Sequence, residues 1–199
     1  MRITGGTVRG RKLAALKSAG EIIRPTSDRV REALFNILAH KVINSKVLDL
    51  YAGTGALGIE ALSRGAEFAV FVDQSRDAAQ LIQANLLTCF PKPKASFLHH
   101  RLPTPHIRYQ LDKKLFPQIT FDLIFMDPPY RQGLAEKTLQ MVADDHLLAP
   151  QGLIIVEEHR SVELPKQIDM LLQKDHRQYG ETAIWIYGTP AEKWKKKLT

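Results

Sequence analysis

The feature of this 199-residue chain that most restricts its fold is a regular alternation of strand-like and helix-like segments. Short apolar runs rich in β-branched and aromatic residues predict strands at 46–51, 68–73, 95–98, 121–126 and 153–157. Apolar residues at helical spacing predict helices between them, at 56–64, 75–87 and 134–144. This alternation favours an α/β fold with a mostly parallel, doubly wound sheet, in which ligands bind beyond the carboxyl ends of the strands.

The amino-terminal region precedes this alternation and is strongly basic. Residues 1–14 are expected to form a short strand pair, and helix-start chemistry before Asp28 predicts a helix at 27–40. We therefore expect a basic β-hairpin extension at 1–23 and one main domain at 24–199.

The carboxyl-terminal half contains two regions of weak pattern. Three prolines and scattered charges at 99–118 indicate a loop with one helical turn, and 165–172 is predicted to be helical. The last predicted element is a hairpin spanning 173–187 that turns at Gly180.

The charge and the cysteine content bound the cellular setting. The chain has 28 Lys and Arg against 21 Asp and Glu, a formal charge of +7 that is compatible with a polyanionic partner but also with ordinary surface. Cys89 is the single cysteine, no apolar run reaches the roughly 20 residues that span a bilayer, and the first residues lack a signal-peptide core. We expect a cytoplasmic protein that does not use a membrane, and a monomer.

A glycine-rich loop follows the first predicted strand of the alternation. Gly53, Gly55 and Gly58 follow the G-x-G-x-x-G pattern, which lets the backbone approach a ligand. Asp73 ends the next strand about 20 residues later, where a carboxylate can accept hydrogen bonds from both hydroxyls of a ribose. Asp49, inside the preceding strand, suits a cationic amino-acid ligand better than a pyrophosphate. A dinucleotide site and a plain tight turn remain the alternatives.

A second motif, Asp127-Pro128-Pro129-Tyr130, ends the predicted strand at 121–126. The two prolines stiffen the chain and remove two backbone donors, leaving the Asp127 carboxylate and the Pro128 carbonyl as acceptors beside the ring of Tyr130. Two acceptors that hold the hydrogens of an exocyclic base amine favour a localised nitrogen lone pair, which can attack a methyl group. The alternative is a rigid turn in which Asp127 caps a helix.

Together these segments resemble, in order and spacing, the bacterial RsmD family, which methylates guanine N2 in 16S ribosomal RNA. The resemblance covers residues 1–187 and rests on 2–6, 9–13, 24–38, 49–55 and 127–130, of which Arg-Pro-Thr-Ser-Asp-Arg-Val-Arg-Glu at 24–32 is the most specific. It implies a class I S-adenosylmethionine-dependent methyltransferase: a Rossmann-like, seven-stranded sheet with the last strand antiparallel, and an amino-terminal hairpin that helps to hold RNA.

The resemblance also implies roles for individual residues. S-adenosylmethionine, whose product is S-adenosylhomocysteine, would be bound by Thr26, Asp49, Ala52, Gly53, Thr54, Gly55 and Asp73. The target base would be held by Asp127, Pro128, Pro129 and Tyr130, and RNA phosphates by Arg9, Arg11, Lys12, Arg24 and Arg29. His99 or His100 stands where the family usually has a short polar residue and Ala beside adenine. No metal is expected, because no acidic or cysteine ligand accompanies these histidines at useful spacing.

Three alternatives to this function stay open. The Asp-Pro-Pro-Tyr motif also serves DNA adenine-N6 methyltransferases, although 199 residues leave little room for a separate target-recognition region. A related corner, usually beginning with Asn, serves protein glutamine methyltransferases. A non-catalytic RNA-binding assembly protein could retain the same fold. The expected partner is ribosomal RNA or a small-subunit ribonucleoprotein.

Overall fold

A computed structural model of the protein describes residues 1–15, 28–115 and 117–190. The chain divides into two compact units, Met1–His100 and Arg101–Thr199. Arg24 and Thr26, and the expected boundary between the extension and the main domain, lie outside the described residues. No helix in the described ranges is long and apolar enough to span a bilayer.

The first unit is built on three parallel strands, β1 (Lys46–Leu50), β2 (Phe68–Asp73) and β3 (Ala95–His99). The strand β2 lies between the other two, with Leu50 opposite Val72 and Asp73 opposite His99. The central residues of β1 and β2 are buried, as the continuous apolar runs predict for strands covered by helices. The carboxyl ends of all three strands point the same way, so the glycine loop after β1 and Asp73 at the end of β2 are neighbours.

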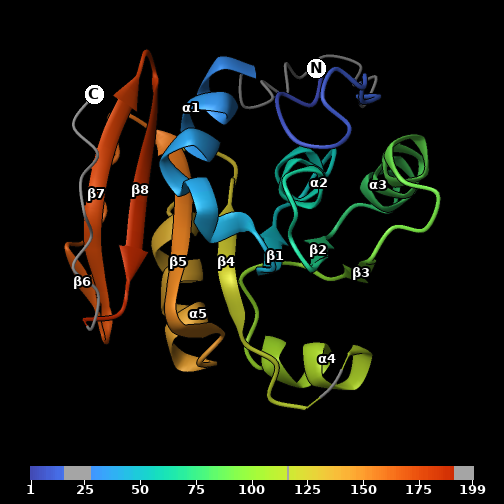
Figure 1. The fold of residues 1–199 in the computed structure, drawn as a ribbon. Helices are drawn as coiled ribbons and strands as arrows, with labels where there is room; N and C mark the ends of the chain where they lie inside the picture. Colours follow the sequence, from blue (N-terminus) through green and yellow to red (C-terminus); the bar gives the residue numbers. More distant parts are fainter. Residues whose placement is uncertain (16–27, 116, 191–199) are drawn as a thin grey trace. The chain divides into compact units, whose positions relative to one another are not determined.

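The helices of this unit are α1 (Asp28–Leu38), the 3₁₀ helix η1 (Ala39–Val42), α2 (Ala56–Ser63) and α3 (Arg76–Cys89). The hydroxyl of Ser75 caps α3 by accepting a hydrogen bond from the backbone of Ala78 at 3.3 Å. Figure 1 shows α2 and α3 on the same side of the strands, with residues 1–15 lying over them. The predicted pair of strands at 1–14 is a single antiparallel bridge between Arg2 and Lys12.

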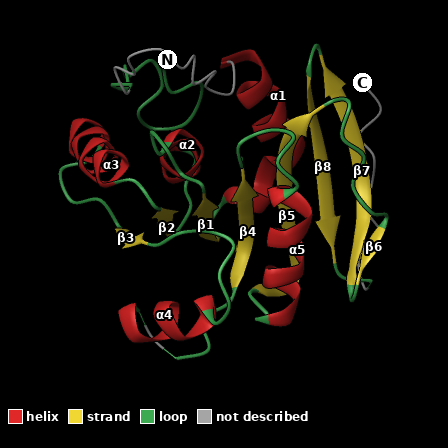
Figure 2. Ribbon diagram, turned by 180° about the vertical axis from the view of Figure 1, so that it is seen from behind, coloured by secondary structure: helices red, strands yellow, loops and turns green. Residues whose placement is uncertain are grey.

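The second unit combines β4 (Phe121–Met126), β5 (Leu148–His159), β6 (Gln167–Ile168), β7 (Leu171–Tyr179) and β8 (Thr182–Gly188) with the helices α4 (Ile107–Lys114) and α5 (Leu134–Asp144). The strands β4 and β5 are parallel, and β8 runs antiparallel to both β5 and β7. Figure 2 shows α5 against β5. The last strand is thus antiparallel, as expected, and the two-residue β6 adds to the seven longer strands.

Two predictions in this unit are wrong. Residues 165–172 are not helical: Ile168 pairs with Leu171 across a tight turn whose Asp169 has a φ of +47°. Gln167 and Ile168 thus pair with Leu172 and Leu171 as strands instead of forming helical hydrogen bonds. Residues 99–118 contain more than one helical turn, since α4 spans Ile107–Lys114. Ile107 and Leu111 lie one turn apart on this helix and are both fully buried, which stabilises it.

Candidate functional site

The glycine loop of the first unit forms a tight connection between β1 and α2. Tyr51, Gly53 and Gly55 have positive φ angles of 60°, 52° and 76°. The backbone N–H of Ala52 donates to Val72 on the neighbouring strand at 3.1 Å, and that of Gly55 donates to Ala52 at 2.7 Å. Backbone conformation and a backbone bond to β2 therefore help to fix the loop.

The three glycines of the motif are required for different reasons. Among the described residues, a Cβ on Gly53 would meet nothing closer than the Tyr51 carbonyl at 3.9 Å, so these residues leave open space there. A Cβ on Gly55 would lie 3.0 Å from Ile82, and one on Gly58 would lie 2.4 Å from the ring of Phe71. Of the three motif glycines, Gly53 is the one beside space that the described residues leave open, whereas Gly55 and Gly58 allow close packing of the protein against itself.

Asp73 holds the loop and retains capacity for a ligand. Its Oδ2 accepts from the backbone N–H of Gly53 at 2.9 Å, and its Oδ1 accepts from that of Ser75 at 2.8 Å. Each carboxylate oxygen has a further lone pair, so the residue can still accept two ribose hydroxyls. His99 lies close by: its Nε2 is 2.7 Å from the carbonyl of Gln74, the residue after Asp73.

Asp49 lies beneath the first turn of α2. Its side chain is buried, and its Oδ2 accepts from the backbone N–H of Gly58 at 2.9 Å. Burial raises the pKa of this carboxyl from 3.8 to about 8; the Gly58 bond partly opposes the rise and the charge of Asp73 adds to it. A cationic amino group placed beside Asp49 would stabilise its ionised form. The site therefore fits the amino-acid end of S-adenosylmethionine.

We expect cofactor binding to release protons at pH 7. The Asp49 carboxyl, with a pKa of about 8, is mostly protonated there in the free protein. A bound ammonium group lowers that pKa, so the proton leaves on binding. Calorimetry of S-adenosylmethionine binding in two buffers with different ionisation enthalpies measures this release, which should approach one proton per site. Asp49→Asn should abolish it, and equal heats in both buffers for the wild type would exclude contact between Asp49 and a cation.

Substitutions at Gly53 and Asp73 are expected to weaken cofactor binding. Asp73→Ala removes the acceptor of the Gly53 backbone N–H and the carboxylate that we expect to accept a ribose hydroxyl, the latter worth about 1–3 kcal/mol. Gly53→Ala places a methyl group in the open space beside the loop. Gly180→Ala is the matched control, because Gly180 also has a positive φ and a Cβ there would meet no described atom within 4 Å, but it lies in the β7–β8 turn. Calorimetry should show weaker binding for the first two and wild-type binding for the control; unchanged affinity in both loop variants would exclude this cofactor site.

The side chain of Asn85 on α3 links the glycine loop to the amino-terminal segment. Its Nδ2 donates to the carbonyl of Thr54 at 2.9 Å and to that of Ala14 at 3.1 Å, and its Oδ1 accepts from the Ala14 backbone at 2.8 Å. The residue is almost fully buried. Sequence reasoning missed it, since a lone Asn in an amphipathic helix resembles ordinary surface.

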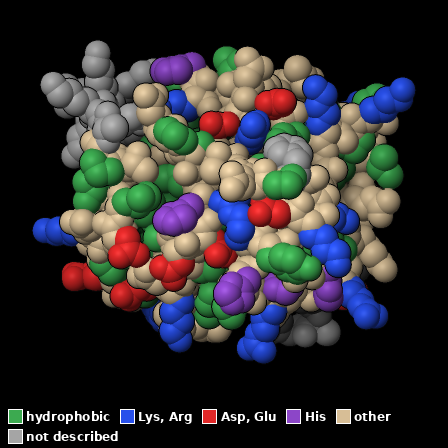
Figure 3. Space-filling model, turned by 90° about the horizontal axis from the view of Figure 1, so that it is seen from below, with side chains coloured by type: hydrophobic (Ala, Val, Ile, Leu, Met, Phe, Trp, Pro, Cys, Tyr) green, Lys and Arg blue, Asp and Glu red, His purple; other side chains and the backbone are tan. Residues whose placement is uncertain are grey.

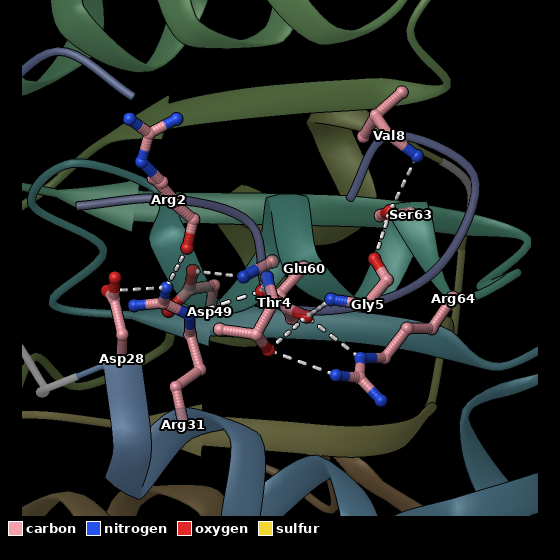
Figure 4. Close-up of polar contacts among 11 residues, drawn as sticks. Arg2, Thr4, Gly5, Val8, Asp28, Arg31, Asp49, Glu60, Ser63 and Arg64 are labelled. Atoms are coloured by element: carbon pink, nitrogen blue, oxygen red, sulfur yellow. Dashed lines mark hydrogen bonds and ion pairs between the residues drawn. The ribbon is translucent and has the colours of Figure 1, made fainter. Parts of the chain in front are cut away.

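Glu60 on α2 is a second residue that sequence reasoning missed. It is fully buried, and its Oε1 accepts from the hydroxyl of Thr4 and the backbone of Gly5, both at 2.8 Å. Its Oε2 accepts from the backbone of Thr4 at 2.8 Å and from Nε of Arg31 at 3.2 Å, and Arg64 adds a donor at 2.9 Å. Figure 4 shows these groups converging on one carboxylate. The amino-terminal segment is thus anchored to the helix that follows the glycine loop.

Arg31 and Ser63 complete this anchor. Arg31 on α1 is fully buried and donates to the carbonyl of Arg2 and to Asp28. The hydroxyl of Ser63 donates to the carbonyl of Gly5 at 2.6 Å and accepts from the backbone of Val8 at 3.1 Å (Figure 4). The motif residues at 2–6 and Arg31 thus join the amino-terminal segment to α1 and α2.

The predicted RNA contacts in the described residues lie on the surface. Their side chains are exposed at Arg9, Arg11, Lys12 and Arg29. Basic side chains occur elsewhere too: the face seen in Figure 3 carries basic, acidic and histidine side chains side by side. Positive charge alone therefore does not mark an RNA surface.

The second motif directly follows the end of β4 in the second unit. Pro128 is buried, Pro129 is exposed, and Asp127 and Tyr130 are half-buried. The hydroxyl of Tyr130 donates to Oε1 of Glu157 at 2.7 Å and lies 3.3 Å from the hydroxyl of Thr182. Burial and the nearby charges of Glu157 and Asp127 raise the pKa of Tyr130. Its phenol therefore stays protonated and keeps its hydrogen bond to Glu157. Glu157 is a residue that sequence reasoning missed.

Comparison with known proteins identifies the family. The family model described as "Conserved hypothetical protein 95" matches residues 1–188. Ribosomal RNA small subunit methyltransferase D of Escherichia coli K12 is 41% identical over 165 residues, covering 83% of this chain and 78% of that protein. A solved Escherichia coli structure, named as methyltransferase yhhF, shares 35% identity and a TM-score of 0.79, covering 96% of this chain and 99% of that one.

A more distant likeness concerns the fold alone. The methyltransferase SMU.776, solved in complex with S-adenosylhomocysteine, is 17% identical with a TM-score of 0.60, covering 80% of this chain and 48% of that one. The expected Rossmann-like class I fold is thus confirmed. From the match over residues 1–188 and the identity to methyltransferase D, we conclude that this chain belongs to the RsmD family of methyltransferases.

Proposed function

We propose that the protein transfers a methyl group from S-adenosylmethionine to the N2 amine of a guanine in small-subunit (16S) ribosomal RNA, free or within a ribonucleoprotein. The observation that carries the proposal is the rigid corner at 127–130, whose tyrosine hydroxyl is held by Glu157 and Thr182. Similarity to a protein named ribosomal RNA small subunit methyltransferase D supports the choice of substrate.

The cofactor would be held within the first unit. When bound, S-adenosylmethionine supplies an electrophilic methyl group on a sulfonium centre. Asp49 would bind its amino group, the backbone of the loop at 52–55 would lie along it, and Asp73 would accept its ribose hydroxyls. Burial of Asp49 and the open space at Gly53 support this assignment.

The corner would prepare the amine of the base. The lone pair of an exocyclic guanine nitrogen is delocalised into the ring and is a poor nucleophile. The Asp127 carboxylate and the Pro128 carbonyl would hold its hydrogens, localise the lone pair, and stabilise the positive charge that develops on nitrogen. Because the Tyr130 hydroxyl already donates to Glu157, this residue would offer the flipped base a ring face and no hydroxyl.

The RNA backbone would lie along the amino-terminal segment. Arg9, Arg11, Lys12 and Arg29 are exposed and would contact phosphates, with Arg24 beside them in sequence. The anchoring of residues 4 and 5 by Glu60 supports this role, because an immobilised segment presents its arginines at defined positions.

Labelled methyl transfer tests the proposal directly. The purified protein is incubated with labelled S-adenosylmethionine and, in parallel, with small-subunit RNA, intact small subunits, DNA and protein. Incorporation into RNA, mapped to a guanine that becomes N2-methylguanine on digestion, is expected. Incorporation into adenine of DNA or into glutamine would replace the proposal by one of those activities. RNA binding without transfer to any acceptor would favour an assembly protein.

A further inference from the structure

The side chains of Arg131 and His159 meet immediately beyond the corner. Nη2 of Arg131 lies 2.7 Å from Nε2 and 3.1 Å from Nδ1 of His159, the last residue of β5. The imidazole of His159 packs edge-on against the ring of Tyr130, with centroids 6.3 Å apart. The proposed chemistry of the base uses neither Arg131 nor His159.

A buried carboxylate places both residues. Oε1 of Glu158 accepts from the backbone N–H of Arg131 at 3.0 Å and from that of His159 at 2.7 Å. Glu158 is 1% exposed, whereas Arg131 is exposed and has a φ of +60°. One acid thus fixes the backbone at two points distant in sequence, so the meeting of the two side chains is built into the fold.

Hydrogen bonds from two directions hold the ring of His159. The backbone N–H of Ser161 donates to Nδ1 at 3.1 Å, and the Ser161 hydroxyl lies 2.8 Å from the same atom. A backbone N–H can only donate, so Nδ1 accepts from Ser161. Nη2 of Arg131 lies within hydrogen-bond distance of both ring nitrogens, so the ring and the guanidinium hold each other in place. Because the Arg131 side chain is exposed, the remaining N–H groups of its guanidinium can donate to an anionic oxygen from a ligand.

We propose that Arg131 and His159 bind a phosphate of the RNA backbone next to the methylated nucleotide; this inference rests on the proposed function. Arginine suits a phosphate because its planar guanidinium offers several donors in a fixed geometry. The contact of His159 with Tyr130 puts this site within about one nucleotide of the base platform. A phosphate gripped there would hold the strand while the base leaves its stack.

Salt dependence of RNA binding tests the site. The probe is a deproteinised 16S RNA fragment that contains the mapped target guanine. Arg131→Gln should flatten the log–log salt dependence by about 0.7, the value for one single-strand phosphate contact. Arg131→Lys should retain most of the slope. The control Lys137→Gln removes an equal charge from an exposed position on α5 and should keep the wild-type slope. Calorimetric affinity for S-adenosylmethionine should be unchanged in all three.

Uncharged analogues of single phosphates locate the phosphate that Arg131 contacts. Methylphosphonate linkages are introduced one at a time beside the target guanine. One of them should weaken RNA binding by the wild type and leave binding by Arg131→Gln unaffected, while the others weaken both proteins equally. If the wild type methylates RNA but no linkage shows this coupling and the salt slopes agree, Arg131 and His159 are ordinary surface. If the wild type neither binds nor methylates RNA, the proposed function itself fails.

Discussion

Asp127→Ala is expected to slow methyl transfer by about a hundred- to a thousandfold, the usual effect of removing one preorganised charged group. The substitution deletes an acceptor for the amine hydrogens and a negative charge beside the developing cation. Asp127→Asn retains the shape and one acceptor oxygen, so its rate should lie between those of Asp127→Ala and the wild type. Affinity for S-adenosylmethionine should not change in either variant.

Single-turnover methylation with saturating cofactor measures this effect, because it isolates the chemical step from product release. Asp144→Asn, an exposed carboxyl at the end of α5, is the control and should react at the wild-type rate. A wild-type rate in Asp127→Ala would reduce the corner to a structural turn, and the catalytic proposal would lose its main support.

Glu60→Ala is expected to lower the free energy of unfolding by about 3–5 kcal/mol, as when one partner of a buried ion pair is removed. The change leaves the buried Arg31 without this carboxylate and deprives the backbone N–H groups of Thr4 and Gly5 of their acceptor. Because the amino-terminal segment is anchored there, the same variant should also bind RNA more weakly.

Urea denaturation gives the stability change, with Glu67→Ala as the control at an exposed position one residue before β2. The control should stay within about 0.5 kcal/mol of the wild type. The double substitution Arg31→Met with Glu60→Leu removes both charges, yet should remain destabilised, since the two backbone donors still lack an acceptor. A loss below about 1 kcal/mol in Glu60→Ala would mean that solvent replaces the buried contacts.

Local sequence patterns were sufficient for the elements that carry the two motifs. The bounds of β2, β4 and α5 match the predicted ranges residue for residue. Periodicity, cap residues and glycines act over a few neighbouring residues, so the helices and strands that they specify can be predicted without knowledge of the fold. Asp73 could be placed at a strand end, and hence at the ligand-binding edge, for the same reason.

Tertiary structure alone decided the roles of the buried charges. Arg31 and Glu60 stand on helices where a charged residue is usually solvated, and they become buried because residues 2–5 pack across both. Glu158 is another charged residue whose role depends on the fold. It accepts from the backbone N–H groups of Arg131 and His159, which lie far apart in the sequence. A charged side chain is stable in the interior only where donors from separate segments converge, and that convergence is a property of the folded chain, not of any local pattern.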